Sequence, residues 1–317
     1  MADAHVGGTG VPRRRRRISR YGEPNAARTR PRRRRPARPT GGPVTSQDTA
    51  THVLDEVVAL EPLGENLYRG RTHEAYANMV GPFGGTTAAT MLGAILQHPE
   101  KHGDPLALTL NYAGPVAEGE FEIEARPART NRSNQHWWVE MRQGDEVVTT
   151  ATAITGLRRE TWSETETAPP AIPAPEELTA ATSDRGVRWV DNYDMRFVTG
   201  GWDDVASGEE QPESTTTMWI RDVQPRGLDH LALASLCDSF FPRSFLRLGR
   251  PVPAGTVTLT IHFLATADEI AAQGTDFLLG SVHSHRFHGN YHDEAARLWS
   301  RDGTLLATGT QLMYFKN

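Results

Sequence analysis

Apolar and polar residues alternate along most of the chain beyond residue 50. Alternation with a period of two predicts half-buried strands, because successive side chains of a strand point to opposite faces of its sheet. In the segment 135–143, for example, Trp137, Val139 and Met141 share one face of such a strand. The pattern predicts strands at 51–59, 65–72, 106–113, 119–128, 135–143, 146–154, 187–199, 214–223, 256–265, 276–288, 295–301 and 304–315.

Two longer apolar stretches, 86–97 and 228–241, predict helices. In the first stretch, Ala88, Met91 and Ile95 recur at helical spacing. The surface of this helix is apolar around nearly its whole circumference, so we expect the helix to be buried. A segment rich in Gly and Pro precedes each stretch and marks where the helix begins.

The predicted elements occur twice in the same order. LALTLNY at 106–112 resembles VTLTIHF at 257–263, and a second pair of matching segments contains the last hairpin of each half. Such a repeat indicates two fused copies of one small α+β domain, each an antiparallel sheet wrapped around a long central helix. We predict an N-terminal domain at 51–160, a linker rich in Pro, Ala, Thr and Glu at 161–185, and a C-terminal domain at 186–317.

The composition narrows the class of protein. No apolar run reaches the ~18 residues that a membrane span requires. The single cysteine, Cys237, excludes both a disulfide framework and a cysteine-based zinc motif. These features predict a cytoplasmic protein that has no membrane segment.

The first 45 residues differ in charge from the rest. Residues 1–40 hold 13 Arg and two acids, so this segment is strongly basic. The remainder holds 21 of the 34 bases and 37 of the 39 acids, so it is acidic. Runs of like charge among Pro, Gly and Thr have no apolar face to bury, so we predict that 1–45 is disordered. Such an arm could attract nucleic acid, but the acidic remainder argues against a nucleic-acid partner. A solvated extension and translation from a misassigned start are the alternatives.

Three segments carry a resemblance to a known family: 84–89 at the start of the first predicted helix, 231–242 in the second, and 302–311 in the last hairpin. In order, spacing and duplication they resemble the double-hotdog acyl-CoA thioesterases of the thioesterase II type. The resemblance implies a tandem hotdog fold and hydrolysis of an acyl-CoA to free acid and CoA, without a metal or redox cofactor. Sheet edges left by the two hotdogs can pair further, so we expect a homo-oligomer.

Two polar residues stand out inside apolar segments. Asp238 lies in the second predicted helix, where a carboxylate must be paired, hydrogen-bonded or neutral. Gln311 lies in the last strand, where the first repeat has Ala153. The resemblance implies that these residues, with a Thr from the strand after the helix, hold and activate the hydrolytic water. We assign the third position to Thr256 and expect Thr258, on the same predicted face, to contact substrate.

The first repeat has Ala94 where the second has Asp238, so we expect it to contribute mainly shape. Gly84 and Gly85 begin its helix, and N–H groups there can polarise a thioester carbonyl, so we assign both to substrate binding. The alternatives are an ordinary glycine-rich helix entry, an Asp238 bonded to backbone at a helix end, and a Gln311 that faces solvent.

Other residues have simpler explanations. Cys237 points about 100° away from Asp238 on a helix, which favours core packing over a nucleophilic role. No known ligand spacing unites the four histidines of the C-terminal domain, so we expect no metal: they are His283, His285, His288 and His292. We expect Trp137 to face the core and Trp138 the surface, with an acyl-channel wall as the alternative.

Two other functions fit the same fold. One is a binding protein for acyl-CoA or lipid that has lost catalysis, and Asp238 with Gln311 argues against it. The other is a hydratase, for which Asp229 and His230 are the candidate acid and base. Asp229 stands at the predicted start of a helix, where capping is the simpler role.

Overall fold

The computed structural model describes residues 51–182 and 186–317 of the chain. The Arg-rich segment predicted at 1–45 and the end of the predicted linker lie outside these residues. Within the described residues, no helix combines the length and the apolar composition needed to cross a membrane.

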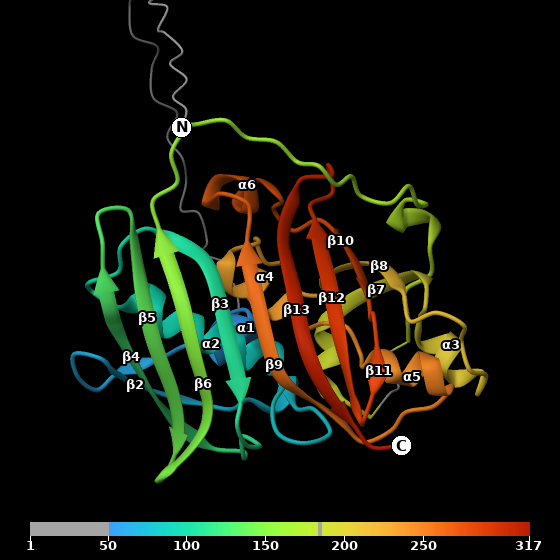
Figure 1. Ribbon diagram of the computed structural model, residues 1–317, viewed down its shortest axis with the longest axis horizontal. Helices are drawn as coiled ribbons and strands as arrows, with labels where there is room; N and C mark the ends of the chain where they lie inside the picture. The colour runs from blue at the N-terminus through green and yellow to red at the C-terminus, as the bar shows by residue number, and fades with distance from the viewer. Residues whose placement is uncertain (1–50, 183–185) are drawn as a thin grey trace, which may run out of the picture. The chain divides into compact units, whose positions relative to one another are not determined.

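The strands of the described residues form a single antiparallel sheet of 13 strands (Figure 1). The first half of the chain contributes β1 (Glu61–Pro62), β2 (Leu67–Arg71), β3 (Asp104–Tyr112), β4 (Glu120–Thr130), β5 (Asn134–Gln143) and β6 (Glu146–Gly156). The second half contributes β7 (Tyr193–Thr199), β8 (Thr216–Asp222), β9 (Ala254–Phe263), β10 (Leu278–His283), β11 (Phe287–His288), β12 (Tyr291–Trp299) and β13 (Leu305–Phe315). The strand order is β1-β2-β4-β5-β6-β3-β9-β13-β12-β10-β8-β7, and β11 pairs with β12.

Strands β3 and β9 join the two halves. Thr109 pairs with Thr260 at the centre of this seam, and their hydroxyl oxygens lie 3.1 Å apart. The flanking pairs, 108 with 261 and 110 with 259, exchange places under a twofold rotation about that centre. Two copies of one domain are expected to meet in this way. The predicted tandem hotdog of class α+β is confirmed.

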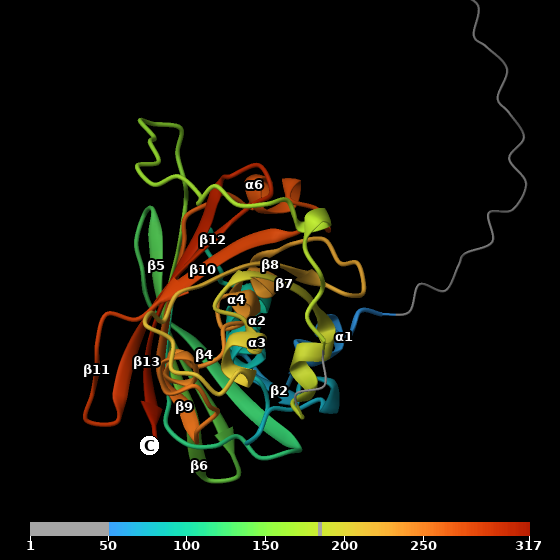
Figure 2. The same ribbon diagram turned by 90° about the vertical axis from the view of Figure 1, so that its right-hand side faces the viewer.

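Helices α2 (Gly84–Gln97) and α4 (His230–Leu236) pack against each other, and Figure 2 shows the sheet curving around them. Every residue of α2 from Gly85 to Ile95 is buried, as its apolar circumference predicts. The shorter elements are α1 (Val53–Val57), α3 (Trp202–Ala206), α5 (Arg243–Leu248), α6 (Ala267–Ala272) and the 3-10 turns η1 (Glu74–Tyr76), η2 (Pro175–Glu177) and η3 (Arg188–Asn192).

Three predicted strands are wrong in whole or in part. The segment 276–288 is interrupted at 284–286, between β10 and β11. The segment 51–59 contains helix α1, because Leu54, Val57 and Val58 are buried at helical spacing. The His52 side chain caps this helix by accepting the Leu54 N–H. The segment 187–199 begins as η3 and becomes a strand only at Tyr193.

The helix predicted at 228–241 is shorter than expected and ends at Leu236. Pro242 has no N–H with which to continue a helix, so the chain turns between Cys237 and Pro242 before α5 begins. Asp238 therefore lies in a turn just beyond the helix, where it is still 92% buried, with 8% of its surface exposed. We call residues 237–242 the Asp238 turn.

Gly85 allows α2 and α4 to approach closely, and this predicts the effect of a substitution. A Cβ atom at position 85 would lie 2.4 Å from the Ser235 carbonyl oxygen, whereas one at Gly93 would meet nothing closer than 3.7 Å. We expect Gly85→Ala to lower the free energy of unfolding by about 1–3 kcal/mol through overpacking. The matched control, Gly93→Ala, should raise it by about 0.5–1 kcal/mol because alanine favours the helix. Urea unfolding measures both, and equal effects of the two substitutions would contradict the explanation.

Candidate active site

Asp238, Gln311 and Thr256 form a continuous hydrogen-bonded chain. The Gln311 amide nitrogen donates to Asp238 Oδ1 at 2.9 Å, and the Thr256 hydroxyl donates to Gln311 Oε1 at 2.9 Å. A buried amide must satisfy both its oxygen and its NH2 group, and these two contacts use both ends. The fold thus brings together the three residues assigned to the hydrolytic water.

A β-bulge turns Thr256 toward this site. Leu312 pairs with Thr258, but the next residue of β13, Met313, pairs with Thr256, so Val257 is an extra residue in β9. Beyond the bulge, Thr256 shares the interior face with Gln311 and Met313. Thr258 lies beside the exposed Leu312 on the outer face of the sheet. The prediction that Thr256 and Thr258 share a face is therefore wrong, and Thr258 lies on the side of the sheet away from Asp238.

The first half of the chain contacts Asp238 from α2. The Gly85 N–H donates to the Asp238 carboxylate, and the Tyr112 hydroxyl donates to the Gly84 carbonyl oxygen at 2.8 Å. A Cβ atom at position 84 would lie 2.7 Å from Asp238 Oδ2, so glycine leaves the room that the carboxylate occupies. The two glycines therefore contact the site, and Gly85 faces the Asp238 carboxylate.

The Asp238 carboxyl group titrates far above its usual range. Burial and then the negative charge of Glu294 raise the pKa of Asp238 to about 8, although the hydrogen bonds from Gln311 and Gly85 favour the ionised form. Burial, followed by the charge of Asp238, raises the pKa of the Tyr112 hydroxyl well above its usual value. Buried carboxyl groups with a raised pKa are concentrated at functional sites.

A cavity of about 360 Å³ opens beside Asp238 and Thr256. Its walls come from both halves of the chain and are mainly aromatic or aliphatic: Met79, Phe83, Val187, Trp189, Trp202, Val205, Phe240, Phe241, Pro242, Phe245, Pro251 and Met313. Phe83 stacks on Trp189 with ring centroids 4.3 Å apart. An apolar wall with a few convergent polar groups suits a ligand that is apolar except at one reactive centre.

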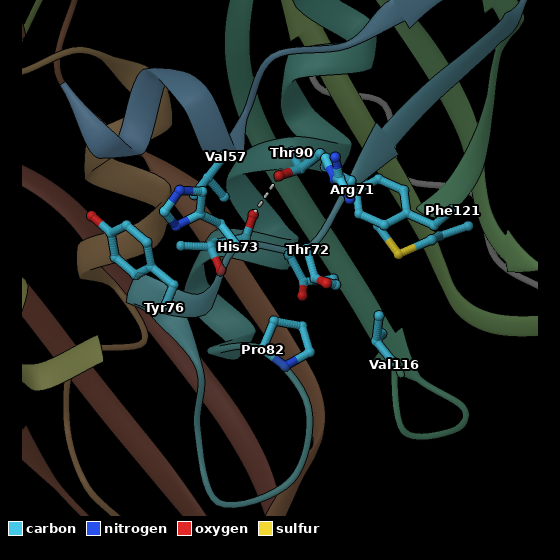
Figure 3. A pocket seen from close by; sticks show the side chains of 12 residues that line it. Val57, Arg71, Thr72, His73, Tyr76, Pro82, Thr90, Val116 and Phe121 are labelled. Carbon is cyan, nitrogen blue, oxygen red and sulfur yellow. Dashed lines mark hydrogen bonds between the residues drawn. The ribbon is translucent and has the colours of Figure 1, made fainter. Parts of the chain in front are cut away.

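A second pocket, within the first half of the chain, has only about 10 Å³ (Figure 3). Tyr76, Phe121 and Thr90 are among its lining residues, and the Thr90 hydroxyl donates to the Thr86 carbonyl oxygen at 2.8 Å. This space holds one water at most. The pocket is therefore too small for an acyl group.

The strand register identifies the counterpart of Gln311 in the first half. Gln311 pairs with Leu259, and Ala153 pairs with Leu108, the residue related to Leu259 across the seam. Ala153 is therefore the equivalent residue, as the sequence comparison predicts, and it offers no polar group. The described residues place the acid and the amide of the site only in the second half.

Several other expectations can be compared with the structure. Cys237 is fully buried, and burial raises the pKa of its thiol, which favours the core-packing role. Trp137 is buried and Trp138 is exposed, as the alternation predicts. Asp229 caps α4 by accepting the Ala232 N–H at 2.8 Å, which is the simpler role expected for it.

The histidines of the second half lie in separate places. Among the described residues, no three His, Cys, Asp or Glu side chains gather as a ligand group. His283 and His285 face each other with Nε2 atoms 3.2 Å apart, and Asp293 pairs with His285. His292 is buried apart from them, next to Glu294.

Sequence reasoning missed the aromatic walls and a buried ion pair. Phe240, Phe241 and Phe245 follow Asp238 closely, and aromatic residues clustered after a buried acid are a signal that could have identified the cavity. Trp189 and Trp202 reach the cavity from distant segments, so no local pattern identifies them. The ion pair joins Arg243 to Glu294, which are 51 residues apart.

Comparisons with known proteins agree with this architecture. A family model described as the acyl-CoA thioesterase N-terminal domain matches residues 73–156, and one described as the acyl-CoA thioesterase C-terminal domain matches residues 166–315. No curated protein sequence matches the chain.

Solved structures add three points of likeness. A protein of unknown function with a hot dog fold from Alicyclobacillus acidocaldarius is 48% identical, with 84% of this chain and 99% of that chain covered and a TM-score of 0.80. The tesB protein of Mycobacterium avium subs. paratuberculosis is 18% identical (83% and 98% covered, TM-score 0.67). An acyl-CoA thioesterase II from Mycobacterium marinum is 19% identical (83% and 98% covered, TM-score 0.64). At the two lower identities the likeness is one of fold.

The fold and the two matched domains define a double-hotdog thioester hydrolase. The chain belongs to the acyl-CoA thioesterase family.

The pKa of Asp238 predicts how stability depends on pH. Since this pKa is about 8 in the folded protein and near 3.8 in an ordinary aspartate, the folded state binds more protons between these values. The stabilising contribution of Asp238 is therefore complete below pH 3.8 and falls as the pH rises toward 8. Asp238→Asn removes this pH dependence. The free energy of unfolding of the variant, relative to that of the parent, should therefore increase from pH 5 to pH 9. Urea unfolding at pH 5, 7 and 9 tests this, and a difference that does not change with pH would contradict the assigned pKa.

Proposed function

We propose that this enzyme hydrolyses an acyl-CoA thioester with a water molecule held by Asp238, Gln311 and Thr256. The observation that supports the proposal is the hydrogen-bonded chain of these three residues at the wall of an apolar cavity. The acyl group would occupy the cavity, and its thioester carbonyl would lie near the Asp238 carboxylate. Gly84, at the first position of α2, would offer its N–H to the carbonyl oxygen, since the first N–H groups of a helix have no partner within it.

The proposed reaction needs one base and a fixed water. Asp238 removes a proton from the water while the water oxygen attacks the thioester carbon. The attack forms a tetrahedral intermediate with negative charge on the carbonyl oxygen. The C–S bond then breaks, and the CoA thiolate leaves and takes up the proton from Asp238, which returns the base to its ionised form. Gln311 orients the carboxylate, and Thr256 orients Gln311, so the geometry is set before substrate binds. This route requires neither a metal nor a redox cofactor.

The pKa of Asp238 sets the pH dependence of this mechanism. Because the base must be ionised, turnover should rise with pH and level off above the pKa of about 8. A binding protein without catalysis would show no such dependence.

Substitution of the base is the central test. Asp238→Asn keeps the shape of the side chain but cannot accept a proton, so kcat should fall ~10²–10⁴-fold on the best substrate of an acyl-CoA panel assayed for thiol release. Gln311→Ala should act in the same direction. The double variant should lose much less than the product of the two effects, since both residues act on one water.

Two controls match these variants. Asp222 is also an aspartate whose pKa burial raises, to about 7, but it lies outside the cavity, so Asp222→Asn should keep turnover. Gln135 is fully buried and hydrogen-bonded in the first half, so Gln135→Ala should reduce stability and leave kcat unchanged. If Asp238→Asn retained turnover within about threefold of the parent, well short of the acid–base range, the binding-protein alternative would replace the proposal.

We also propose that the protein is a homo-oligomer that pairs through the outer face of β12 and β13. Tyr291, Leu312 and Tyr314 are each 39–45% exposed there, and Tyr291 lies opposite Tyr314. Adjacent apolar side chains of this size on one surface are typical of protein contacts.

The proposed interface predicts the effect of a charge. Leu312→Glu should reduce the molar mass measured by light scattering at micromolar concentration, because it places a carboxylate in the interface. Trp162→Glu, at an 80% exposed position of the linker, should leave the mass unchanged. A parent protein that is monomeric and fully active under these conditions would refute the assembly.

A further inference from the structure

A group of buried charged and polar side chains lies next to the proposed catalytic residues. Arg243, His292 and Glu294 are each at most 2% exposed. Glu294 of β12 is the cross-strand partner of Gln311 of β13, and both residues face the interior. Opposite residues of an antiparallel pair have Cβ atoms about 5 Å apart. Glu294 is therefore the immediate neighbour of the residue that hydrogen-bonds Asp238.

Arg243 connects Glu294 to the Asp238 turn. Its backbone N–H donates to Glu294 Oε1 at 3.0 Å, and its Nε donates to the Phe241 carbonyl oxygen at 2.9 Å. The guanidinium also donates to Thr216 Oγ1 of β8 and lies over the Phe241 ring. The buried pair thus fixes the C-terminal end of the turn whose second residue is Asp238.

Stability alone does not explain this arrangement. A buried ion pair gains little over apolar residues of similar size, because both charges lose their hydration. Within the described part of the chain, Glu294 Oε2 and His292 Nε2 have no hydrogen-bond partner, which adds to the cost. Groups kept in such unfavourable surroundings are concentrated at functional sites.

We propose that Glu294 is a positioning residue for the hydrolytic reaction, which holds the Asp238 turn through Arg243 and makes Asp238 a stronger base through its own negative charge. This inference rests on the proposed function of Asp238. It adds a residue that does not contact substrate but determines the pH range in which the base works.

The other titratable groups near Asp238 are neutral. Burial raises the pKa of the Tyr112 hydroxyl from β3 and of the Cys237 thiol next to Asp238. Burial lowers the pKa of His292 from β12 to about 4, so this ring carries no charge near neutral pH. Thr256, Gln311 and the Gly85 N–H, from β9, β13 and α2, do not titrate.

Glu294 and Arg243 are the charged groups that remain. Burial raises the pKa of Glu294 to about 7, whereas the positive charge of Arg243, whose Nε lies 3.8 Å from Glu294 Oε1, favours the ionised form. Glu294 is thus the negative member of a buried ion pair. Its charge is the second cause, after burial, of the raised pKa of Asp238.

Glu294→Gln tests the inference, because glutamine keeps the size and an oxygen for the Arg243 N–H but removes the charge. The measurement is kcat/KM for the best acyl-CoA between pH 5.5 and 9.5. The midpoint of the rising limb should move down by on the order of one pH unit, because a negative charge close to a buried carboxyl group raises its pKa. At high pH kcat should fall more than KM changes, since a weaker base slows the chemical step.

Asp293→Asn is the matched control. It removes the same charge one residue away on β12, from a side chain that is 38% exposed and pairs with the exposed His285. The midpoint should stay within about 0.2 pH units of the parent, because Asp293 faces the opposite side of the strand and solvent screens its charge. A purely structural role of Glu294 would lower the melting temperature of Glu294→Gln and leave its midpoint in place, and that result would overturn the inference.

Glu294→Gln leaves Arg243 buried without its counter-charge, which can prevent folding. The double variant Glu294→Gln/Arg243→Met removes both charges and should show a smaller shift in the same direction, because loss of the more distant positive charge of Arg243 partly offsets loss of the negative charge. Asp238→Asn, assayed in parallel, separates the two levels of the proposal. Full turnover of Asp238→Asn would refute the proposed function. If Asp238→Asn loses turnover but the midpoint of the Glu294 variants does not shift, only the role of Glu294 is refuted.

Discussion

The pairing of β3 with β9 is the contact on which the rest of the structure depends. It fuses two small sheets into one, and it places α2 and α4 side by side on the same face of that sheet. The N-terminus of α2 then meets the turn that follows α4, so the Gly85 N–H reaches the Asp238 carboxylate. Neither half contains all of these groups, and the site exists only where the halves meet.

That seam also explains how the protein keeps a carboxylate in its interior. Removing a charge from water is unfavourable unless donors replace the lost hydration. Gln311 and Gly85 provide two donors, from opposite halves of the chain, while burial and Glu294 oppose ionisation. The balance leaves Asp238 able to bind and release a proton near physiological pH, which an exposed aspartate with a pKa near 3.8 does not do.

Much of the fold could be predicted because it follows from local pattern. Alternation located most strands, the apolar circumference located α2, and the repeat implied two copies of one domain. Asp238 and Gln311 were identifiable as polar residues in apolar segments that lack counterparts in the other repeat. The predicted position of Thr258 was wrong because the bulge at Val257 places Thr256 and Thr258 on opposite faces of the sheet. A one-residue irregularity of this kind leaves little trace in the sequence. Trp189, Trp202 and the pair of Arg243 with Glu294 depend on contacts between distant segments, which a local pattern does not encode.

The two halves have diverged in a way that matches their roles. The first half has Ala153 in place of Gln311, and its pocket beside Tyr76 and Phe121 has only about 10 Å³. The second half carries the acid, the amide and the buried ion pair. Fusion into one chain permits this division, because a symmetric dimer of identical hotdogs must repeat every substitution in both copies. One half can then lose the buried polar groups while the other retains them at a cost in stability. The cavity of about 360 Å³ beside Asp238 is lined by residues of both halves, so the half that lacks the acid and the amide still shapes it.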